Sequence, residues 1–251
     1  MSSNLSYALT RIQFGQITES TFTKNSDVLI EALGAEYPIF VSKKIEQTEI
    51  RLDSSTFEQS VIKTQVPMIT LLSADEEWGV RVTLDHIILH TYNYLSYENF
   101  EERVASILAQ IQKLMGIRHL AFTGLRYLNK FDETNFSQNF KRKEFLQPAF
   151  ERFGMAGSNL ASRYVDGKFG ININSGVIVN NKKYPQDITE LLGDLKVENP
   201  VMEGAWAHLD LDIHSREPKL IPYSHENVMS TLGELRARAK IIYNSIIKDS
   251  N

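Results

Sequence analysis

The sequence predicts an α+β fold in which two related β-α-β-β-β-α halves form a mostly antiparallel sheet, with long amphipathic helices packed on one side. Three observations support this fold class. The composition, 42% hydrophobic and 23% charged, is that of an ordinary globular protein. Two long helices have similar starts, and the same order of elements occurs twice along the chain. We therefore expect residues 1–251 to form a single compact unit, with a first half at 5–117 and a second half at 118–251.

The two long helices are predicted at residues 96–115 and 224–247. Each begins at a serine, Ser96 or Ser224, which is a favourable N-cap residue. Glu98 and Glu226 follow in the first turns, where a negative charge suits the helix dipole. Apolar residues fall on one face of each helix, namely Phe100, Val104, Ile107, Leu108, Ile111 and Leu114 in the first, and Val228, Leu232, Leu235, Ala239, Ile242 and Ile246 in the second.

The other elements repeat in the same order. For the first half we expect a strand from Ala8, a helix near 25–35 and extended segments at 39–53, 60–73 and 78–92. For the second half we expect a strand from Ala121, a helix near 138–153 and extended segments at 161–167, 169–180 and 204–214, with an insertion at 184–200. This order favours an internal duplication. The alternative is an undivided α+β sheet with two capped helices.

Charge and composition restrict the classes of function. A net charge of −4 provides no overall electrostatic attraction for nucleic acid or an acidic membrane. The chain has no cysteine, which excludes disulfides, thiolate nucleophiles and cysteine–zinc sites. The first residues lack the pattern of a signal peptide, and no apolar run approaches the ~18–20 residues of a membrane span. We therefore expect a cytoplasmic protein that does not associate with membranes.

Residues 120–129 are predicted to form a central strand that is buried on both faces, because apolar residues occupy both of its alternating sets. Arg126 lies in this strand, and its guanidinium keeps its proton, so it needs acceptors close by. Asp210 and Asp212 are the expected partners. We group five residues as a binding or structural polar cluster: Arg126, Tyr127, Asn129, Asp210 and Asp212.

Residues 208–214 alternate regularly between apolar and polar residues, which is typical of a strand with one buried face. Leu209, Leu211 and Ile213 should face a core. The other face carries two histidines and two carboxylates, which are competent ligands for a divalent metal: His208, Asp210, Asp212 and His214. The other interpretation is a solvated face lined by ion pairs. We favour this interpretation, and it requires no cofactor.

The hexapeptide from Gly124 to Asn129 resembles the G-L-R-Y-[IL]-N signature of a sporadically distributed family of uncharacterised bacterial proteins of about this length. Weaker matches cover most of the chain: the first strand, Tyr37-Pro38, the helix start at Tyr97–Phe100, the strand at Asp210–Ile213 and His225-Glu226. Lys130 stands where the family often has arginine. The resemblance implies no activity, but the patchy occurrence of the family implies mobile genes, such as defence or toxin–antitoxin islands.

The sequence contains none of the familiar catalytic signatures, such as a phosphate-binding loop, a Gly-x-Ser-x-Gly elbow or a His-Glu-x-x-His helix. We therefore predict a non-enzymatic binding or accessory protein whose partner is another protein encoded nearby. The alternative is a metal-dependent hydrolase or nuclease that uses the face formed by His208, Asp210, Asp212 and His214.

Overall fold

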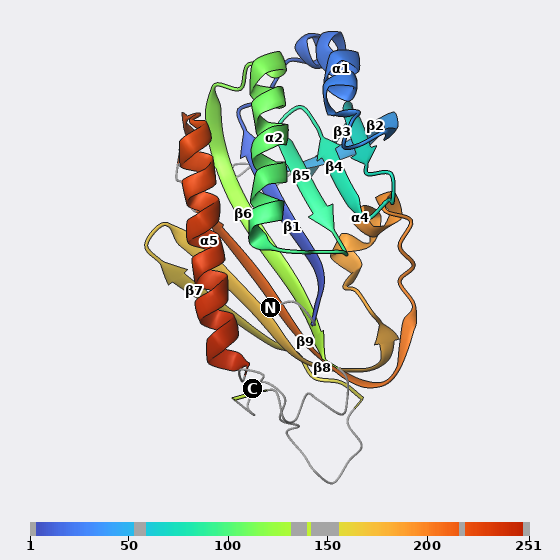
Figure 1. Ribbon diagram of the computed structural model, residues 1–251, viewed down its shortest axis with the longest axis vertical. Coiled ribbons are helices and arrows are strands. Elements are labelled where there is room, and N and C mark those ends of the chain that lie inside the picture. The colour runs from blue at the N-terminus through green and yellow to red at the C-terminus, as the bar shows by residue number, and fades with distance from the viewer. Residues whose placement is uncertain (1–3, 53–58, 132–139, 142–155, 216–218, 248–251) are drawn as a thin grey trace.

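Ten strands form one antiparallel sheet in the computed structural model, which describes residues 4–52, 59–131, 140–141, 156–215 and 219–247 (Figure 1). The strands are β1 (Leu5–Phe14), β2 (Ile39–Leu52), β3 (Gln59–Leu72), β4 (Trp78–Val82), β5 (His86–Thr91), β6 (His119–Phe131), β7 (Leu160–Asp166), β8 (Phe169–Lys182), β9 (Val201–Ser215) and β10 (Ile221–Pro222). Their order is β2-β3-β4-β5-β1-β6-β9-β8-β7, with β10 beside β6. The predicted α+β class with a mostly antiparallel sheet is confirmed.

Helices α1 (Glu19–Leu33), α2 (Tyr97–Met115) and α5 (His225–Ile246) pack their apolar residues into the main core. The predicted N-caps are confirmed, since the hydroxyls of Ser96 and Ser224 accept hydrogen bonds from the backbone of Asn99 and Asn227. Figure 1 shows α2 and α5 in front of the sheet. None of the described helices is both long and apolar enough to cross a membrane.

The central pair of the sheet joins the two halves of the chain. β1 and β6 pair in antiparallel fashion, with Leu9 opposite Arg126 and Thr10 opposite Leu125. From this pair, the order runs outward as β1-β5-β4-β3-β2 on one side and β6-β9-β8-β7 on the other. Backbone hydrogen bonds therefore continue without interruption from the first half into the second.

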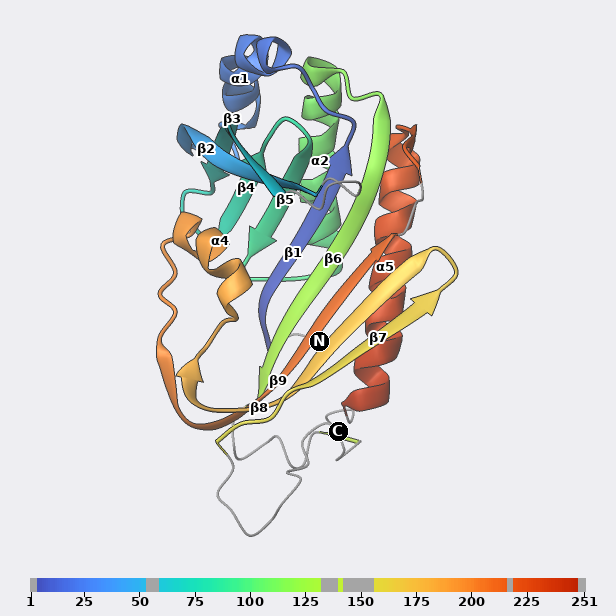
Figure 2. The ribbon, with the colours of Figure 1, turned by 180° about the vertical axis from the view of Figure 1, so that it is seen from behind.

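The opposite face of the sheet is partly covered by a short helical segment, which contains η2 (Gln186–Ile188) and α4 (Thr189–Asp194) (Figure 2). A second, smaller core lies beneath it. This core joins Tyr7, Leu72 and Leu128 of the sheet to apolar residues of the segment, namely Tyr184, Ile188, Leu191, Leu192 and Leu195. The segment corresponds to the insertion expected at 184–200. It leaves and rejoins the sheet at directly paired residues, Lys182 of β8 and Val201 of β9.

The expected β-α-β-β-β-α order is wrong for the first half, where four strands follow α1. The segment expected at 78–92 is a hairpin of β4 and β5, because residues 83–85 turn between them. The Thr83 hydroxyl stabilises this turn by accepting a hydrogen bond from the backbone N–H of His86 at 3.2 Å.

The helix expected near 138–153 lies outside the described residues, except at 140–141, where Phe140 forms a β-bridge with Ile247.

Candidate functional site: a polar pocket beside Arg126

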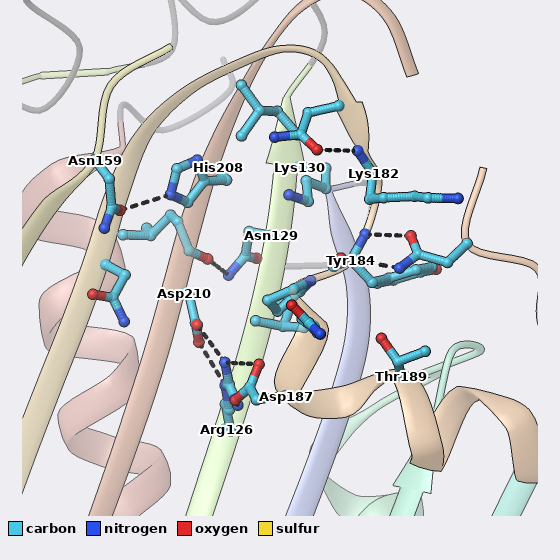
Figure 3. Close-up of a pocket in the computed structure, with 18 residues that line it drawn as sticks. Arg126, Asn129, Lys130, Asn159, Lys182, Tyr184, Asp187, Thr189, His208 and Asp210 are labelled. Atoms are coloured by element: carbon cyan, nitrogen blue, oxygen red, sulfur yellow. Dashed lines mark hydrogen bonds and ion pairs between the residues drawn. The ribbon is translucent and has the colours of Figure 1, made fainter. Parts of the chain in front are cut away.

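A pocket of about 860 Å³ lies between strands β6, β8 and β9 and the segment that carries η2 and α4 (Figure 3). Most of the residues that line it are polar. It contains three cationic side chains, two carboxylates and one imidazole, from Arg126, Lys130, Lys182, Asp187, Asp210 and His208. Five asparagines complete much of the wall: Asn129, Asn159, Asn174, Asn181 and Asn199. A volume of this size suits a small organic ligand.

Arg126 forms one end of the pocket and is held by two carboxylates. Its Nε and Nη2 donate to the two oxygens of Asp210 at 2.9 and 2.7 Å, a bidentate pair. Its Nη1 and Nη2 also donate to Asp187 of η2. The expected pairing with Asp210 is therefore present. The Arg126 and Asp210 side chains are 15% and 9% exposed, whereas Asp187 is 60% exposed, so Asp210 is the buried partner.

The electrostatics of this group keep the guanidinium charged. Burial alone would lower the pKa of Arg126, but the hydrogen bonds and charges of Asp210 and Asp187 outweigh burial, and the pKa is raised. Burial raises the pKa of Asp210, and the bonds from Arg126 oppose that shift. The cation and its two carboxylates thus satisfy one another, and Arg126 has little free hydrogen-bonding capacity for a ligand.

Lys130 lies four residues further along β6, at the other end of the pocket. Its ammonium forms no hydrogen bond or ion pair with any residue that the structure describes. Burial, followed by repulsion from Lys183, lowers its pKa to about 8, and the charge of Asp210 only partly compensates. Lys130 is therefore a desolvated amine in a pocket wall, which is costly unless something else meets its charge.

His208 of β9 is directly opposite Lys130 of β6 in the strand register. Its Nε2 lies 3.3 Å from Oδ1 of Asn159, whereas its Nδ1 is buried without a hydrogen-bond partner among the described residues. Burial, and then the charge of Lys130, lowers the pKa of His208 to about 4. The imidazole is therefore neutral at neutral pH, and the charge at this end of the pocket comes from lysines.

The polar cluster expected from the sequence is only partly assembled. Asn129 lines the pocket and donates to the carbonyl of Leu209 at 3.2 Å. Tyr127 lies on the opposite face of β6, where its hydroxyl is 3.2 Å from that of Tyr94 in the main core. Asp212 does not pair with Arg126 but accepts a hydrogen bond from Asn172 at 3.1 Å. Tyr127 therefore belongs to the core and not to the site.

Asp212 instead lines a second, smaller pocket of about 230 Å³, together with Arg163 and Asn172. Arg126, Asp187 and Asp210 line both pockets. The ion-paired group of Arg126 therefore separates the larger, lysine-bearing pocket from the smaller one.

The four residues of the metal hypothesis lie along the same face of β9 but are engaged separately. Both oxygens of Asp210 bond to Arg126, His208 contacts Asn159, and the ring of His214 stacks on Phe122 at 5.4 Å. Within the described part of the chain, no group of three or more His, Cys, Asp or Glu side chains could hold a metal ion. The metal hypothesis stays a prediction that requires a direct test.

A second buried arginine on this face was not recognised in the sequence. Arg81 of β4 bonds to Asp194 and Glu190 of α4, so the helical segment that bounds the pocket is tied to the sheet by Arg81 as well as Arg126. Burial would lower the pKa of Arg81, but these carboxylates raise it. A lone arginine in the apolar strand Trp78–Val82 was the available signal.

No protein-family model matches this chain, and a search of curated proteins finds no similar sequence.

Proposed function

We propose that this chain is a non-enzymatic binding protein and that the pocket between β6, β8, β9 and the helical segment is its recognition site. The observation that carries this proposal is the Lys130 ammonium, which faces the pocket without a hydrogen-bond partner among the described residues. Burying an unpaired cation is unfavourable. Ionisable side chains whose pKa is perturbed by burial gather at functional sites, because a ligand can supply the missing partner.

We further propose that it acts as an accessory to another protein, encoded nearby in a defence or toxin–antitoxin island. The signature resemblance motivates this proposal, and the two edges of the sheet support it. Among the strands that the structure describes, β2 pairs only with β3, and β7 only with β8. Large apolar side chains are exposed beside these edges, at Phe40, Val41, Leu160, Tyr164 and Val165. Exposed edge strands are templates for a strand of another chain.

A tagged full-length chain used to capture proteins from the native host, followed by co-expression with neighbouring genes, tests the accessory role. Phe40→Lys and Tyr164→Lys place a charge on the two edges. Ile241→Lys, at a 69% exposed position on α5, is the matched control. We expect one edge variant to lose the captured partner while the control retains it. Recovery of the chain alone under every condition would contradict the accessory role.

We also infer that the halves at 5–117 and 118–251 descend from one duplicated unit, with α2 and α5 in equivalent positions. The support is the outward strand order from the centre, with the two-residue strand β10 left aside. β1 is followed by β5, β4, β3 and β2, and β6 is followed by β9, β8 and β7, so each half runs from its first strand to its last long strand and then to the preceding ones. Superposing residues 7–116 on 119–248 tests this inference, with the additional strand β2 treated as an extension. Equivalent helices that superpose on different strands would contradict it.

A further inference from the structure

The distribution of charge in the large pocket identifies the class of ligand, if the binding function proposed above holds. We propose that the pocket binds a small phosphorylated metabolite, such as a sugar phosphate or a nucleoside monophosphate. Its phosphate would lie against Lys130 and Lys182, and its hydroxyl or base groups against the asparagines.

The first support is the separation of paired and unpaired cations. At one end Arg126 is already neutralised by Asp210 and Asp187. At the other end lie Lys130 and Lys182, and no described residue forms an ion pair with either. Figure 3 shows Lys130 and Lys182 together, away from the Arg126–Asp187 contact. Among the described residues that line this pocket, the positive charge that has no ion-pair partner therefore lies at the lysine end.

The second support is the number of cations at that end. Lys183 follows Lys182, and its charge contributes to lowering the pKa of Lys130, so three ammonium groups act on this region. A phosphate monoester carries about −1.5 to −2 charges and three strong acceptor oxygens at neutral pH. A single carboxylate carries one negative charge and would neutralise only part of the charge of these three ammonium groups. A phosphate is therefore the better match.

The third support is the rest of the wall. Asparagine side chains carry both hydrogen-bond donors and acceptors, as recognition of hydroxyl groups or of base edges requires. Asn159 and Asn174 line the pocket from the β7–β8 side. Asn181 and Asn199 are fixed by bonds to the backbone of Lys182 and Tyr184. The volume of about 860 Å³ accommodates a molecule the size of a mononucleotide.

Isothermal titration of the full-length protein with two matched pairs of probes tests the proposal. The pairs are ribose 5-phosphate with ribose, and adenosine 5′-monophosphate with adenosine. We expect at least one phosphorylated probe to bind about tenfold or more tightly than its uncharged counterpart, since hydrogen bonds to charged groups are the strong ones. Lys130→Met should abolish this difference and Lys182→Met should reduce it. Lys63→Met, at a paired surface lysine of β3, should leave it unchanged.

Proton uptake gives a second readout. The bound phosphate should raise the pKa of Lys130, so binding at pH 8 should take up protons, measurable as a heat that depends on the buffer. Among the described residues, the charged or titratable groups around Lys130 are Arg126 of β6, His208 and Asp210 of β9, Lys182 and Lys183 at the end of β8, and Tyr184 and Asp187 of the helical segment. Lys130→Met should lose the proton uptake.

Three results would overturn the phosphate assignment: no binding of any probe, equal binding of charged and uncharged probes, or unchanged binding by Lys130→Met. Equal binding would leave the pocket as a recognition site for a neutral molecule. The accessory role fails separately, through the capture experiment with the edge variants.

Discussion

Arg81 of β4 and Asp194 of α4 are 113 residues apart in the sequence and form an ion pair on the face of the sheet that carries the pocket. Arg81 also donates to the side chain and the backbone carbonyl of Glu190, at 3.0 and 2.8 Å. Because Arg81 belongs to the first half and Asp194 to the second, this contact links the halves independently of the β1–β6 pair.

Replacing Arg81 with methionine should destabilise the protein by about 3–5 kcal/mol, because Asp194 would keep a buried charge without its partner. The side chains of Arg81 and Asp194 are only 8% and 9% exposed. Urea unfolding measures the loss, and limited proteolysis should show faster cleavage within 183–200. Lys44→Met, which removes an exposed surface pair with Glu19, is the control and should change stability by less than about 1 kcal/mol.

Arg126→Ala should also yield an unstable or insoluble protein, with a cost of about 3–5 kcal/mol, since Asp210 is buried opposite it. Arg126→Lys should rescue stability poorly, because lysine lacks the planar fork that bonds both oxygens of Asp210. Asp187→Asn should have a much smaller effect, since that carboxylate is 60% exposed. An Arg126→Ala protein that melts like wild type but no longer binds its partner or ligand would show that Arg126 belongs to the recognition site.

Lys130→Met should stabilise the protein at pH 7, on the order of 2 kcal/mol after allowance for solvent screening, because a half-buried charge without a partner among the described residues is removed. The pKa of Lys130 is lowered from 10.5 to about 8 in the folded state. Between these values the unfolded chain binds the additional proton, so the stability of the wild type should rise with pH through this window. The variant should lack that rise in urea unfolding at pH 7 and pH 10. A less stable variant at pH 7 would contradict the assignment of Lys130 as an unpaired cation.

Gly79→Ala should cost about 1–3 kcal/mol through overpacking. A Cβ at this position would lie 2.7 Å from Cε1 of His90 and 3.0 Å from Leu195. The His90 ring cannot move aside easily, because it is fully buried and its Nδ1 is 2.8 Å from the hydroxyl of Tyr7. Thermal unfolding measures the cost. Gly193→Ala in α4 should be neutral or slightly stabilising, because no described atom outside its own helix backbone and chain neighbours lies within 4 Å of the added carbon.

Titration with Mn²⁺ and Zn²⁺ tests the metal-dependent alternative. We expect no binding at the 208–214 face, because both oxygens of Asp210 are used by Arg126. A heat of binding that is lost in both Asp210→Asn and His208→Ala would contradict this expectation and favour a metal-dependent hydrolase.

Local patterns in the sequence predicted the parts of the fold that depend on local chemistry. The serine caps at 96 and 224 and the alternation along β9 were sufficient to place α2, α5 and the buried Leu209, Leu211 and Ile213. The pairing of Arg126 with Asp210 followed from the need of a buried guanidinium for an acceptor. These inferences required only short-range periodicity and the cost of burying charge.

The remaining parts depend on contacts between distant segments. The partners of Arg81 lie in the 184–200 insertion, whose position on the sheet no local pattern indicates. The expected polar cluster includes Tyr127 as well as Arg126, although neighbouring residues of a strand point to opposite faces. In the sequence, Lys130 differs from the signature of the resembled family, but nothing there predicts that its ammonium lacks an ion-pair partner. That property depends on where η2 and β8 place their charged groups.

The junction of β8 and β9 has a consequence for how this protein can diversify. Because Lys182 and Val201 are directly paired, β8 and β9 form a hairpin, and residues 183–200 are an insertion at its closed end. Their length and sequence can change without shifting the register of any strand, provided that Leu128 and Tyr7 stay covered and that Arg81 keeps a carboxylate partner. A relative with a different segment in place of residues 183–200 would therefore have a different wall on one side of the pocket. Its ligand preference would change, while the sheet beneath would stay the same.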